Sequence, residues 1–541
     1  MSRDVVDVLI VGSGASAVHA AIPLVEAGLR VRMLDFGNVD EHYAPLIPDA
    51  PFAAIRSTDP DQHRYLLGDR FEGIGFEPTG AGAQLTPPRR HVVRDTHRLT
   101  PVQSDDFFPL ESLARGGLAE AWGAGCPTFA DADLRGTPLS RALLDPHYEA
   151  VARRIGISGE PDDLRAFFGE APWLQPGLKV DTNAQTILRR YDSQRARLAR
   201  AGLHLGIARL AALSRELGER RPVQYHDMEF FSDRGRSVYR PRYTLEELRA
   251  IDSFDYRPRV LVGEFRETET GVEVCGRHTD GTPVRHRGDH LVLAAGTLGT
   301  ARIVLRSLGE PKRTLPLVCN PHTYAATLNL AMLGRRADEA RHSLAQLCFV
   351  HAPEGPQGDT TVGHLYSYRS LQLFRLARDL PLPFRESLRV LPSIVSALTI
   401  LILQHADRPT ALKSCRLVAG GLDGTDRLRI DYSLSAEEQR RIDRCERAIL
   451  RAFRRLRCLP LRRVRPGHAA SVHYAGTLPM TRDDRPWTTG VDGRLAGTRA
   501  VRVADGSVFP ALPSRGLTFT MMANARRIGC ALRDEIAGGA R

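Results

Sequence analysis

The stretch that decides the fold is Asp4-Val-Val-Asp-Val-Leu-Ile-Val11, followed directly by Gly12-Ser-Gly14-Ala-Ser-Ala17. The apolar run predicts a buried strand that ends in a glycine turn. Residues Val18 to Gly28 carry the apolar spacing of a helix that stops at a glycine. Leu29 to Leu34 form a second predicted strand, closed by Asp35. This order of strand, glycine turn, helix, strand and acid predicts a βαβ unit of the type that binds dinucleotides.

Each residue type in this turn has a physical task in such a site. Gly12 permits the tight turn, Gly14 lets the backbone approach a pyrophosphate, and Ala17 lets the helix pack close to the sheet. The helix N-terminus offers free N–H groups to phosphates, and Ser16 adds a hydroxyl donor. Asp35 can accept hydrogen bonds from a ribose diol. The alternative is a glycine-rich turn in an α/β protein that binds nothing.

Length and composition set the class of protein around this unit. The chain has 541 residues, of which 42% are hydrophobic and 26% charged, so two to four folding units or two large interleaved ones are expected. Disorder, collagen-like repeats and a coiled coil are excluded. The net charge of +12 comes almost wholly from dispersed arginines, since the chain has three lysines. We therefore expect no nucleic-acid partner, and at most a mild bias toward anionic substrates.

Cysteine spacing and the chain start add two exclusions. The eight cysteines contain no C-x-x-C pair, so a zinc or dithiol site has no local support and no metal is expected. No signal-peptide pattern opens the chain, which favours a cytoplasmic protein with reduced thiols. The longest apolar stretch, 391–403, is too short to span a bilayer. It predicts a buried helix or strand, with a membrane-facing or substrate-channel surface as the alternative.

Further elements lie in the middle of the chain. Helices are expected over 145–157 and 184–201. Strands are expected over 260–265, 271–275 and 290–294, with Asp280-Gly281 as a hairpin turn. Residues 294–305 predict a second strand, glycine turn and helix unit, which contains Ala295 and Gly296.

The last seventy residues concentrate groups that can carry chemistry. His473 stands three residues before Gly476-Thr477. A predicted strand, 500–504, runs into Asp505-Gly506-Ser507, and Leu517-Thr518 opens a predicted helix that continues through Arg533. The sequence contains no P-loop, no H-E-x-x-H and no G-x-S-x-G elbow.

These segments together resemble the glucose–methanol–choline (GMC) family of FAD-dependent oxidoreductases. The N-terminal turn resembles the FAD fingerprint of the family, and Ala294 to Thr300 resembles its internal strand–glycine–helix signature. The segment from His473 to Thr518 resembles its closing motif in order and approximate spacing. Residues 116–123, which include Gly116, Gly117 and Trp122, resemble the loop that lies against the flavin.

The resemblance implies roles for particular residues. It places His473 next to the substrate carbon and flavin N5, and Asp505-Gly506 near the ribityl chain and pyrophosphate. It aims the N-terminus of the last helix, at Leu517 and Thr518, toward the flavin pyrimidine edge. Ala121 stands where some members carry a histidine that attaches FAD covalently, which implies non-covalent FAD.

One departure from the family pattern concerns the usual second histidine or asparagine. Its position holds Ser514, with Arg515 adjacent, and either group could assist at a substrate oxygen. Among the other histidines, His468 is the reserve candidate for the base, and His322 could line the substrate cleft. Cys126, after the flavin loop, is expected to be a small buried residue.

The implied chemistry is oxidation of an alcohol to an aldehyde or ketone. His473 would act as general base, with hydride transfer to flavin N5. The substrate would be a small-molecule alcohol, namely a sugar, a polyol, a glycosylated natural product or a lipid alcohol, and oxygen or another carrier would accept the electrons. The alternatives are a lyase or photochemical decarboxylase of the same fold, a NAD(P)-binding reductase, and a membrane-surface protein that uses 391–403 to reach a lipid-linked substrate.

The expected fold class is α/β, with a Rossmann-like FAD-binding domain interleaved with an α+β substrate-binding domain that contains an antiparallel sheet. The FAD-binding domain is expected to be discontinuous and to comprise 1–45, 105–135, 240–310 and 466–541. The substrate-binding or cap regions are expected to comprise 46–104, 136–239 and 311–465.

Overall fold

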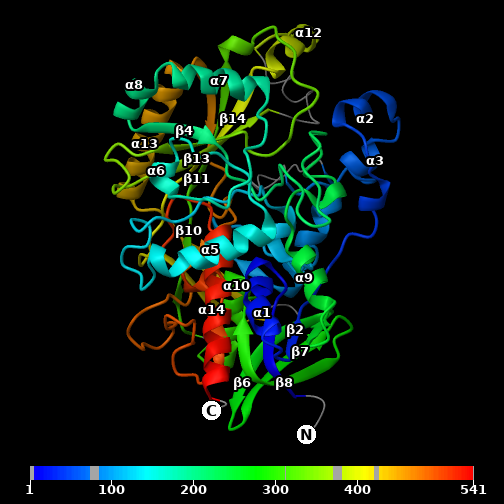
Figure 1. Cartoon of the computed structure of the whole chain (residues 1–541), viewed down its shortest axis with the longest axis vertical. Coiled ribbons are helices and arrows are strands. Elements are labelled where there is room, and N and C mark those ends of the chain that lie inside the picture. Colours follow the sequence, from blue (N-terminus) through cyan, green and yellow to red (C-terminus); the bar gives the residue numbers. More distant parts are fainter. Residues whose placement is uncertain (1–4, 74–83, 311, 369–380, 420–425, 540–541) are drawn as a thin grey trace.

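The computed structural model describes residues 5–73, 84–310, 312–368, 381–419 and 426–539. Within these ranges the chain builds two large sheets, one in each half of the molecule (Figure 1). The fold class predicted from the sequence is confirmed, since a mainly parallel unit and an antiparallel sheet are both present. Asp4, where the first strand was expected to begin, lies outside the described residues.

The first large sheet contains the predicted βαβ unit. Its strands are β1 (Val5–Val11), β2 (Val31–Leu34), β5 (Phe254–Arg257), β6 (Val260–Thr268), β7 (Gly271–His278), β8 (Pro283–Leu293) and β19 (Val501–Val503). β1 pairs in parallel with β2 and β8, and β19 joins the other side of β8. β6, β7 and β8 form antiparallel hairpins, and Gly281 has a φ of 89° in the predicted turn between β7 and β8. The sheet therefore joins strands from the start, middle and end of the chain.

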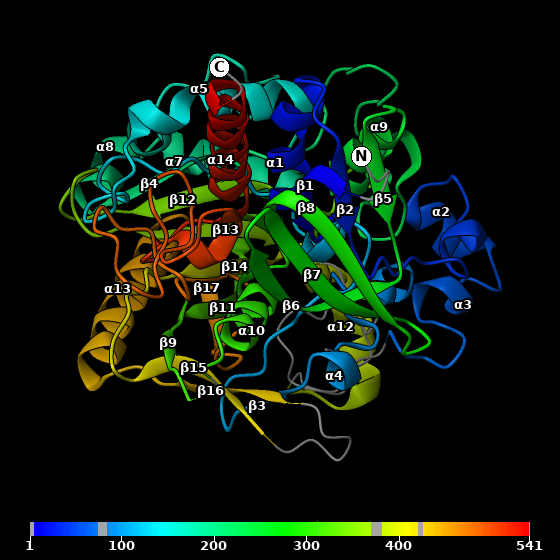
Figure 2. The same cartoon turned by 90° about the horizontal axis from the view of Figure 1, so that it is seen from below.

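Two helices from opposite ends of the chain pack on this sheet. α1 (Ala15–Glu26) follows β1, and α14 (Thr518–Gly539) ends the described chain. They run side by side in both Figure 1 and Figure 2. A Cβ on Gly529 would lie 2.3 Å from the carbonyl oxygen of Ala20, so a glycine is required where the two helices cross. This contact brings the last helix to the dinucleotide turn.

The second large sheet is antiparallel and has two different faces. Its strands are β4 (Leu203–Ile207), β11 (His322–Asn329), β12 (Leu347–His351), β13 (Thr361–Ser367), β14 (Leu398–Gln404) and β17 (Cys458–Val464). One face packs its aliphatic residues against α7 (Thr182–Asp192) and α13 (Ala436–Arg455), where Ile187, Ile449 and Phe453 are buried. Because side chains alternate along a strand, the other residues of β11, β13 and β14 face the interior of the molecule.

Two small sheets and several short elements connect these parts. β10 (Val318–Cys319) pairs with β18 (Tyr474–Ala475), and a four-stranded sheet contains β3 (Val102–Gln103), β9 (Leu315–Pro316), β15 (Lys413–Val418) and β16 (Arg427–Tyr432). The remaining α-helices are α2 (Phe52–Thr58), α3 (His63–Leu66), α4 (Thr96–Leu99), α5 (Arg141–Ile155), α6 (Arg165–Phe168), α8 (Arg195–Arg200), α9 (Pro241–Arg249), α10 (Thr297–Ser307) and α12 (Phe384–Val395). The short 3₁₀ helices are η1 (Ala44–Leu46), η2 (Pro87–Val93), η3 (Gly117–Ala121), η4 (Arg234–Arg236), η5 (Leu330–Met332) and η6 (Gly506–Val508).

Two sequence expectations need correction in detail. The helix expected over 184–201 is two helices, α7 and α8, because the chain turns at Ser193-Gln194. The apolar stretch 391–403 is also divided: it contains the end of α12 and most of β14. Leu391, Leu401 and Leu403 are each no more than 5% exposed, as a buried segment requires. Pro392 and Ser393 are exposed, however, and Ile400 and Ile402 line a cavity, so the predicted burial holds for only part of the stretch.

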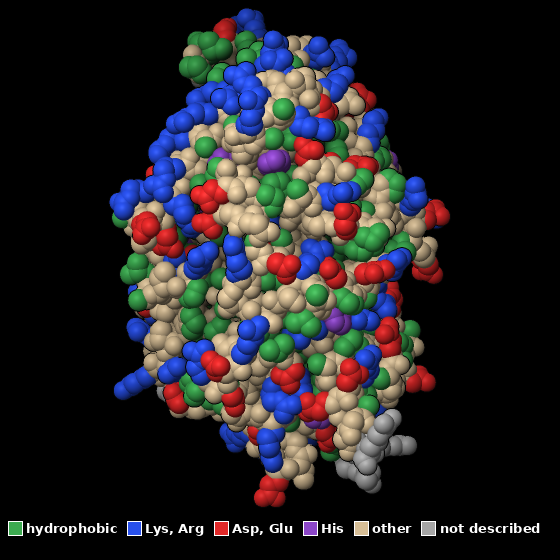
Figure 3. Space-filling model, turned by 60° about the vertical axis from the view of Figure 1, so that its left-hand side comes forward, with side chains coloured by type: hydrophobic (Ala, Val, Ile, Leu, Met, Phe, Trp, Pro, Cys, Tyr) green, Lys and Arg blue, Asp and Glu red, His purple; other side chains and the backbone are tan. Residues whose placement is uncertain are grey.

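The distribution of surface charge and the state of the cysteines can be compared with the sequence expectations. Figure 3 shows Lys and Arg side chains interspersed with Asp and Glu on the face drawn. All eight cysteines belong to the described residues and are free thiols, and Cys126 is fully buried as expected. Within the described ranges, no helix has the length and hydropathy that crossing a membrane requires.

Candidate active site

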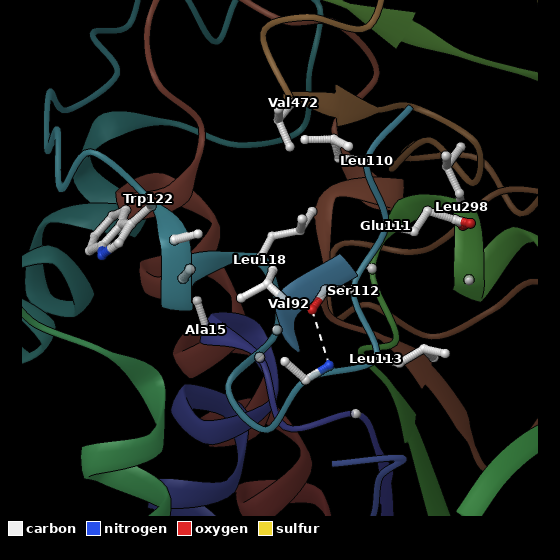
Figure 4. A pocket seen from close by; sticks show the side chains of 18 of the residues that line it. Ala15, Val92, Leu110, Glu111, Ser112, Leu113, Leu118, Trp122, Leu298 and Val472 are labelled. Carbon is white, nitrogen blue, oxygen red and sulfur yellow. Dashed lines mark hydrogen bonds between the residues drawn. The ribbon is translucent and has the colours of Figure 1, made fainter. Parts of the chain in front are cut away.

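A large cavity of about 1670 Å³ lies between the two large sheets. Its walls include the dinucleotide turn (residues 12–17) and the loop before α5 (residues 116–123). The start of α14 and one face of the antiparallel sheet form other walls. Figure 4 shows Ala15, Leu118 and Trp122 on one side of this cavity, with Glu111 and Leu298 on another. Segments that are hundreds of residues apart in sequence therefore meet around one space.

The first glycine of the dinucleotide turn is required by the backbone. Gly12 has a φ of 99°, and a Cβ there would lie 2.5 Å from the carbonyl oxygen of Ala294. Gly14 lines the cavity, where a Cβ would meet nothing closer than 3.9 Å in the protein. Across from it, a Cβ on Gly117 would lie 3.1 Å from the Cα of Gly14. The close approach of the two loops thus explains the glycine at 117. At position 14, a glycine leaves the backbone open to contact by a ligand in the cavity.

Ser13 organises this end of the cavity, although sequence reasoning missed it. Its hydroxyl donates to Oδ2 of Asp35 at 2.6 Å and accepts the backbone N–H of Gly116 at 2.9 Å. The Tyr256 hydroxyl donates to the same carboxylate oxygen at 2.8 Å. Burial raises the pKa of Asp35 to about 6, against the lowering effect of these two hydroxyls. The only sequence signal for Ser13 was its place between the two glycines of the turn.

The start of α1 fits a phosphate-bearing group. Ser16 lines the cavity, and its buried Oγ has no hydrogen-bond partner within the described residues. It stands in the first turn of α1, where backbone N–H groups lack intrahelical acceptors. Ala17 is fully buried behind it, and its small side chain faces the protein interior. An orphaned hydroxyl beside free N–H groups is what a bound dinucleotide phosphate would satisfy.

The second glycine turn and the C-terminal acid lie on a neighbouring wall. Ala295 and Gly296 line the cavity between β8 and α10, and Gly296 has a φ of 81°. Asp505 accepts from the Thr300 hydroxyl at 2.6 Å and from the backbone N–H of Ser507 at 2.9 Å. A Cβ on Gly506 would lie 2.5 Å from the Thr297 hydroxyl, so this strand end packs directly against α10.

The loop before α5 and the last helix complete the predicted cofactor side. Trp122 lines the cavity, and its Nε1 donates to the carbonyl oxygen of Tyr239 at 2.9 Å. Gly116 and Gly117 have φ values of 94° and 65°, which favour glycine. Leu517 and Thr518 line the cavity at the N-terminus of α14.

His473 lies at the far end of the same cavity. Its Nδ1 lies 3.2 Å from Oδ1 of Asn320. Burial, together with the nearby imidazole of His364, lowers the pKa of His473 to about 4. The pairing of β10 with β18 explains the contact: Cys319 is opposite Tyr474, so the adjacent Asn320 reaches His473.

The amide of Asn320 has one orientation that satisfies its neighbours. Its Nδ2 donates to the carbonyl oxygens of His405 and Pro513, each at 2.8 Å. The amide oxygen is therefore directed at the imidazole and accepts a hydrogen bond from Nδ1–H. Sequence reasoning missed Asn320, since no local pattern connects it to His473.

The two predicted assistants of His473 do not reach the cavity. The Arg515 guanidinium is fully buried, pairs with the Asp133 carboxylate at 2.9 Å and donates to the carbonyl oxygens of Thr128 and Phe167. Ser514 is also buried, with its hydroxyl 3.1 Å from that of Thr360. Neither lines the cavity, so we withdraw the expected role of Arg515 and Ser514 at a substrate oxygen. Both side chains instead fasten the loop that precedes α14.

The antiparallel sheet supplies a wall that sequence reasoning largely missed. His322 lines the cavity as considered from the sequence, whereas His468 does not and instead contacts the ring of Tyr432. Ser367, at the end of β13, also lines the cavity. The polar side chains that share a sheet face with His322 are Tyr324, His364, Tyr366 and Gln404. They occupy alternate positions of β11, β13 and β14, so strand periodicity was the signal that could have found them.

Comparisons with known proteins identify a matching family model and similar proteins. A family model described as GMC oxidoreductase matches residues 421–525. Paromamine 6'-oxidase of Streptomyces fradiae is 26% identical over 556 residues, covering 98% of this chain and 92% of that protein. The crystal structure of pyridoxine 4-oxidase from Mesorbium loti superposes with a TM-score of 0.56 at 14% identity, covering 97% of this chain and 98% of that one.

Fold, cavity and matches define a flavin oxidoreductase that acts on alcohol groups. The resemblance to the GMC oxidoreductase family is thus confirmed by the family-model match over residues 421–525 and by the oxidase relative, and members of that family generally bind FAD.

Proposed function

We propose that this protein oxidises a small-molecule alcohol to an aldehyde or ketone with bound FAD, and that His473 is the general base. The observation that carries the proposal is that His473, fixed by Asn320, shares one cavity with a dinucleotide turn. A base and a cofactor site in one cavity are what alcohol oxidation requires.

The residues of the described cavity fit FAD. The glycines at 12, 14 and 117, with the orphaned Ser16 hydroxyl, would hold the pyrophosphate. Asp35 would hold a ribose, and the N-terminus of α14 would stabilise negative charge on the ring. When bound, FAD supplies a hydride acceptor. We propose non-covalent binding, because Ala121 stands where a histidine would be needed for attachment.

We propose that the chain is divided into cofactor-binding and substrate-binding parts at the boundaries expected from the sequence. Residues 1–45, 105–135, 240–310 and 466–541 would bind the cofactor. Residues 46–104, 136–239 and 311–465 would form the substrate side, and this assignment is supported by the strands of β4, β11–β14 and β17.

His473 is prepared for proton transfer by its surroundings. Because Asn320 Oδ1 accepts from Nδ1–H, the lone pair of the ring is on Nε2. The lowered pKa keeps the ring neutral at physiological pH. In the proposed step the substrate O–H bond would break and its proton would form a new N–H bond at Nε2. The C–H bond of the alcohol carbon would break as its hydride passes to the acceptor that bound FAD would supply, which leaves a C=O bond.

Two relatives support an alcohol as the substrate. They are named as oxidases of paromamine and of pyridoxine, and both cover nearly the whole of this chain. We propose that oxygen or another carrier returns the cofactor to its oxidised state.

Anaerobic mixing of the purified protein with a panel of alcohols in the dark tests the proposal. We expect loss of the visible flavin absorbance with at least one alcohol, and its return when air or an added electron carrier is admitted. Bleaching that requires light, or turnover of substrate with no change in the flavin spectrum, would instead point to the photochemical or lyase alternatives on this fold.

A further inference from the structure

The antiparallel sheet presents a polar but uncharged wall to the cavity directly beside His473. His322 and Gln404 are paired across β11 and β14. Gln404 adjoins His405, whose carbonyl oxygen accepts from Asn320, and Asn320 in turn contacts His473. The same sheet face adds His364 and Tyr366 from β13 and Tyr324 from β11. These side chains therefore face the end of the cavity where the reacting alcohol must lie, an argument that rests on the proposed function.

Some polar atoms of this wall have no protein partner. Both ring nitrogens of His322 and Oε1 of Gln404 are buried without a hydrogen-bond partner within the described residues. Gln404 is only 7% exposed. Leaving such groups unpaired costs free energy, so a molecule that supplies donors and an acceptor to them is favoured. Hydroxyl groups provide both functions.

The wall carries no charge at neutral pH. Burial lowers the pKa of His364 to about 4 and that of His322 to about 3, and the imidazoles of His473, His405 and His364 further lower the pKa of His322. Burial raises the pKa of Tyr324 to about 12 and also raises that of Tyr366. Gln404 does not titrate, so all five polar side chains are neutral.

Charged groups of the described cavity lining come from other segments. Asp35 and Asp505 flank the two glycine turns, while Glu111 pairs with Arg302 and Asp426 pairs with Arg306. The remaining charged residues of the lining also lie outside the antiparallel sheet, namely Arg90, Arg94, Asp95, Arg98, Glu264, Arg277 and Asp280. Behind the wall, Glu446 is bound by Thr323, Arg463 and Arg465 and does not line the cavity. An ammonium or carboxylate group placed at the wall would thus lose water without gaining a counter-charge.

Aromatic faces complete the wall. The rings of His322 and Tyr324 stack with centroids 4.9 Å apart and planes inclined by 30°. A flat or cyclic molecule can pack on such rings while its hydroxyls reach the unpaired nitrogens.

We propose that this sheet wall selects an uncharged, hydroxyl-bearing ring as the substrate and discriminates against analogues that carry an ammonium or carboxylate group near the reacting alcohol. The specificity-determining residues are His322 and Gln404. The substrate class then follows from the chemistry of the wall, and it is independent of what the relatives oxidise.

Matched probes on two scaffolds test the inference. One set is para-bis(hydroxymethyl)benzene, para-(aminomethyl)benzyl alcohol and para-(hydroxymethyl)benzoate, and the other is glucose with glucosamine. For the holoenzyme we expect the neutral member of a set to bind and to show a kcat/KM at least ~10-fold above its charged analogues. Dissociation constants from calorimetry, measured anaerobically, report selection even where no probe reduces the flavin.

An isosteric variant gives the sharper measurement. Gln404→Glu places a carboxylate on the wall, so the ratio of affinities for the amine-bearing and neutral probes should rise by ~10-fold. The matched control is Gln439→Glu on the exposed surface of α13, which should leave this ratio unchanged.

The outcomes separate this inference from the proposed function. Selective binding of neutral probes without flavin reduction supports the wall and shows that these probes are not substrates, while the panel of alcohols decides the proposed function. If charged and neutral probes reduce the flavin with equal kcat/KM, the wall does not select uncharged substrates, whereas the proposed alcohol oxidation is supported. Binding of no neutral probe, or an unchanged affinity ratio in Gln404→Glu, also overturns the inference.

Discussion

The two ends of the cavity are built in opposite ways. At the dinucleotide end, one continuous turn of six residues supplies the glycines, the hydroxyls and the helix terminus, and Asp35 follows one strand later. At the sheet end, His473, Asn320, His322 and Gln404 come from separate strands or strand junctions. The first end depends on backbone shape and the second on the register of strand pairing, so the two should respond differently to mutation.

The largest expected effect comes from breaking the backbone shape at the dinucleotide end. Gly12→Val would drive side-chain atoms into the carbonyl of Ala294 and force a β-branched residue to a φ of 99°. We expect the purified protein to contain no flavin, as measured by visible absorbance. Gly28→Ala is the control, because its φ is also positive but no atom lies within 4 Å of the added Cβ. Flavin retention in Gly12→Val would contradict the proposed cradle.

The next largest effect should come from removing the proposed base at the sheet end. His473→Ala should retain FAD and slow anaerobic flavin reduction by roughly 10²–10⁴-fold, the usual contribution of a general base. Stopped-flow absorbance measures both quantities. His468→Ala, five residues earlier but outside the cavity lining, should reduce the rate far less. Equal losses in the two variants would remove His473 from the role.

A smaller effect should follow from changing the orienting partner. Asn320→Ala leaves Nδ1 without its acceptor, and we expect a decrease of about tenfold in flavin reduction with FAD still bound.

Asn320→Asp distinguishes orientation from general damage. His473 must be neutral to accept a proton, so kcat/KM of the native enzyme should fall only as pH drops through about 4. An adjacent carboxylate favours the imidazolium and raises its pKa, which moves this acid limb to higher pH. If the native enzyme and Asn320→Asp lose kcat/KM at the same acidic pH, the hydrogen bond between residue 320 and His473 does not set the pKa of the base.

The smallest expected effect is on the pH dependence of the free energy of unfolding, to which the buried histidines at the sheet end of the cavity contribute. The imidazoles of His322, His364 and His473 have pKa values of about 3 to 4 in the folded protein, below the 6.5 of an unperturbed histidine. As pH falls below about 6.5 the unfolded chain therefore binds protons that the folded chain does not, and stability is lost down to about pH 3. Chemical denaturation at several pH values should show this slope, and His364→Gln should make it shallower. An unchanged slope in that variant would argue that this ring is charged in the folded state.

Prediction from sequence succeeded where the determinants are consecutive. The turn at Gly12 to Ala17, the hairpin at Asp280-Gly281 and the second glycine turn at Gly296 were all found, because positive φ and close backbone approach leave a local signature. The helix expected over 184–201 was wrong as one element, because apolar spacing continued across the turn at Ser193.

Arg515 shows why prediction of the candidate site was less complete. Its position in the closing motif suggested a group at the substrate, but the structure uses it to neutralise Asp133 inside the protein. Whether an arginine faces a cavity or a buried carboxylate depends on a partner that is 382 positions away in the chain, and no local pattern reports that partner.

The sequence by itself determined the βαβ unit, the order of the closing motif and the resemblance to the GMC family, because these rest on backbone conformations that neighbouring residues impose. Only the tertiary structure decided that Asn320 orients His473, that the sheet wall is uncharged and that Arg515 is absent from the cavity. The physical reason is that hydrogen bonds and ion pairs between distant residues depend on strand register and burial, and both are settled when the two sheets enclose the cavity.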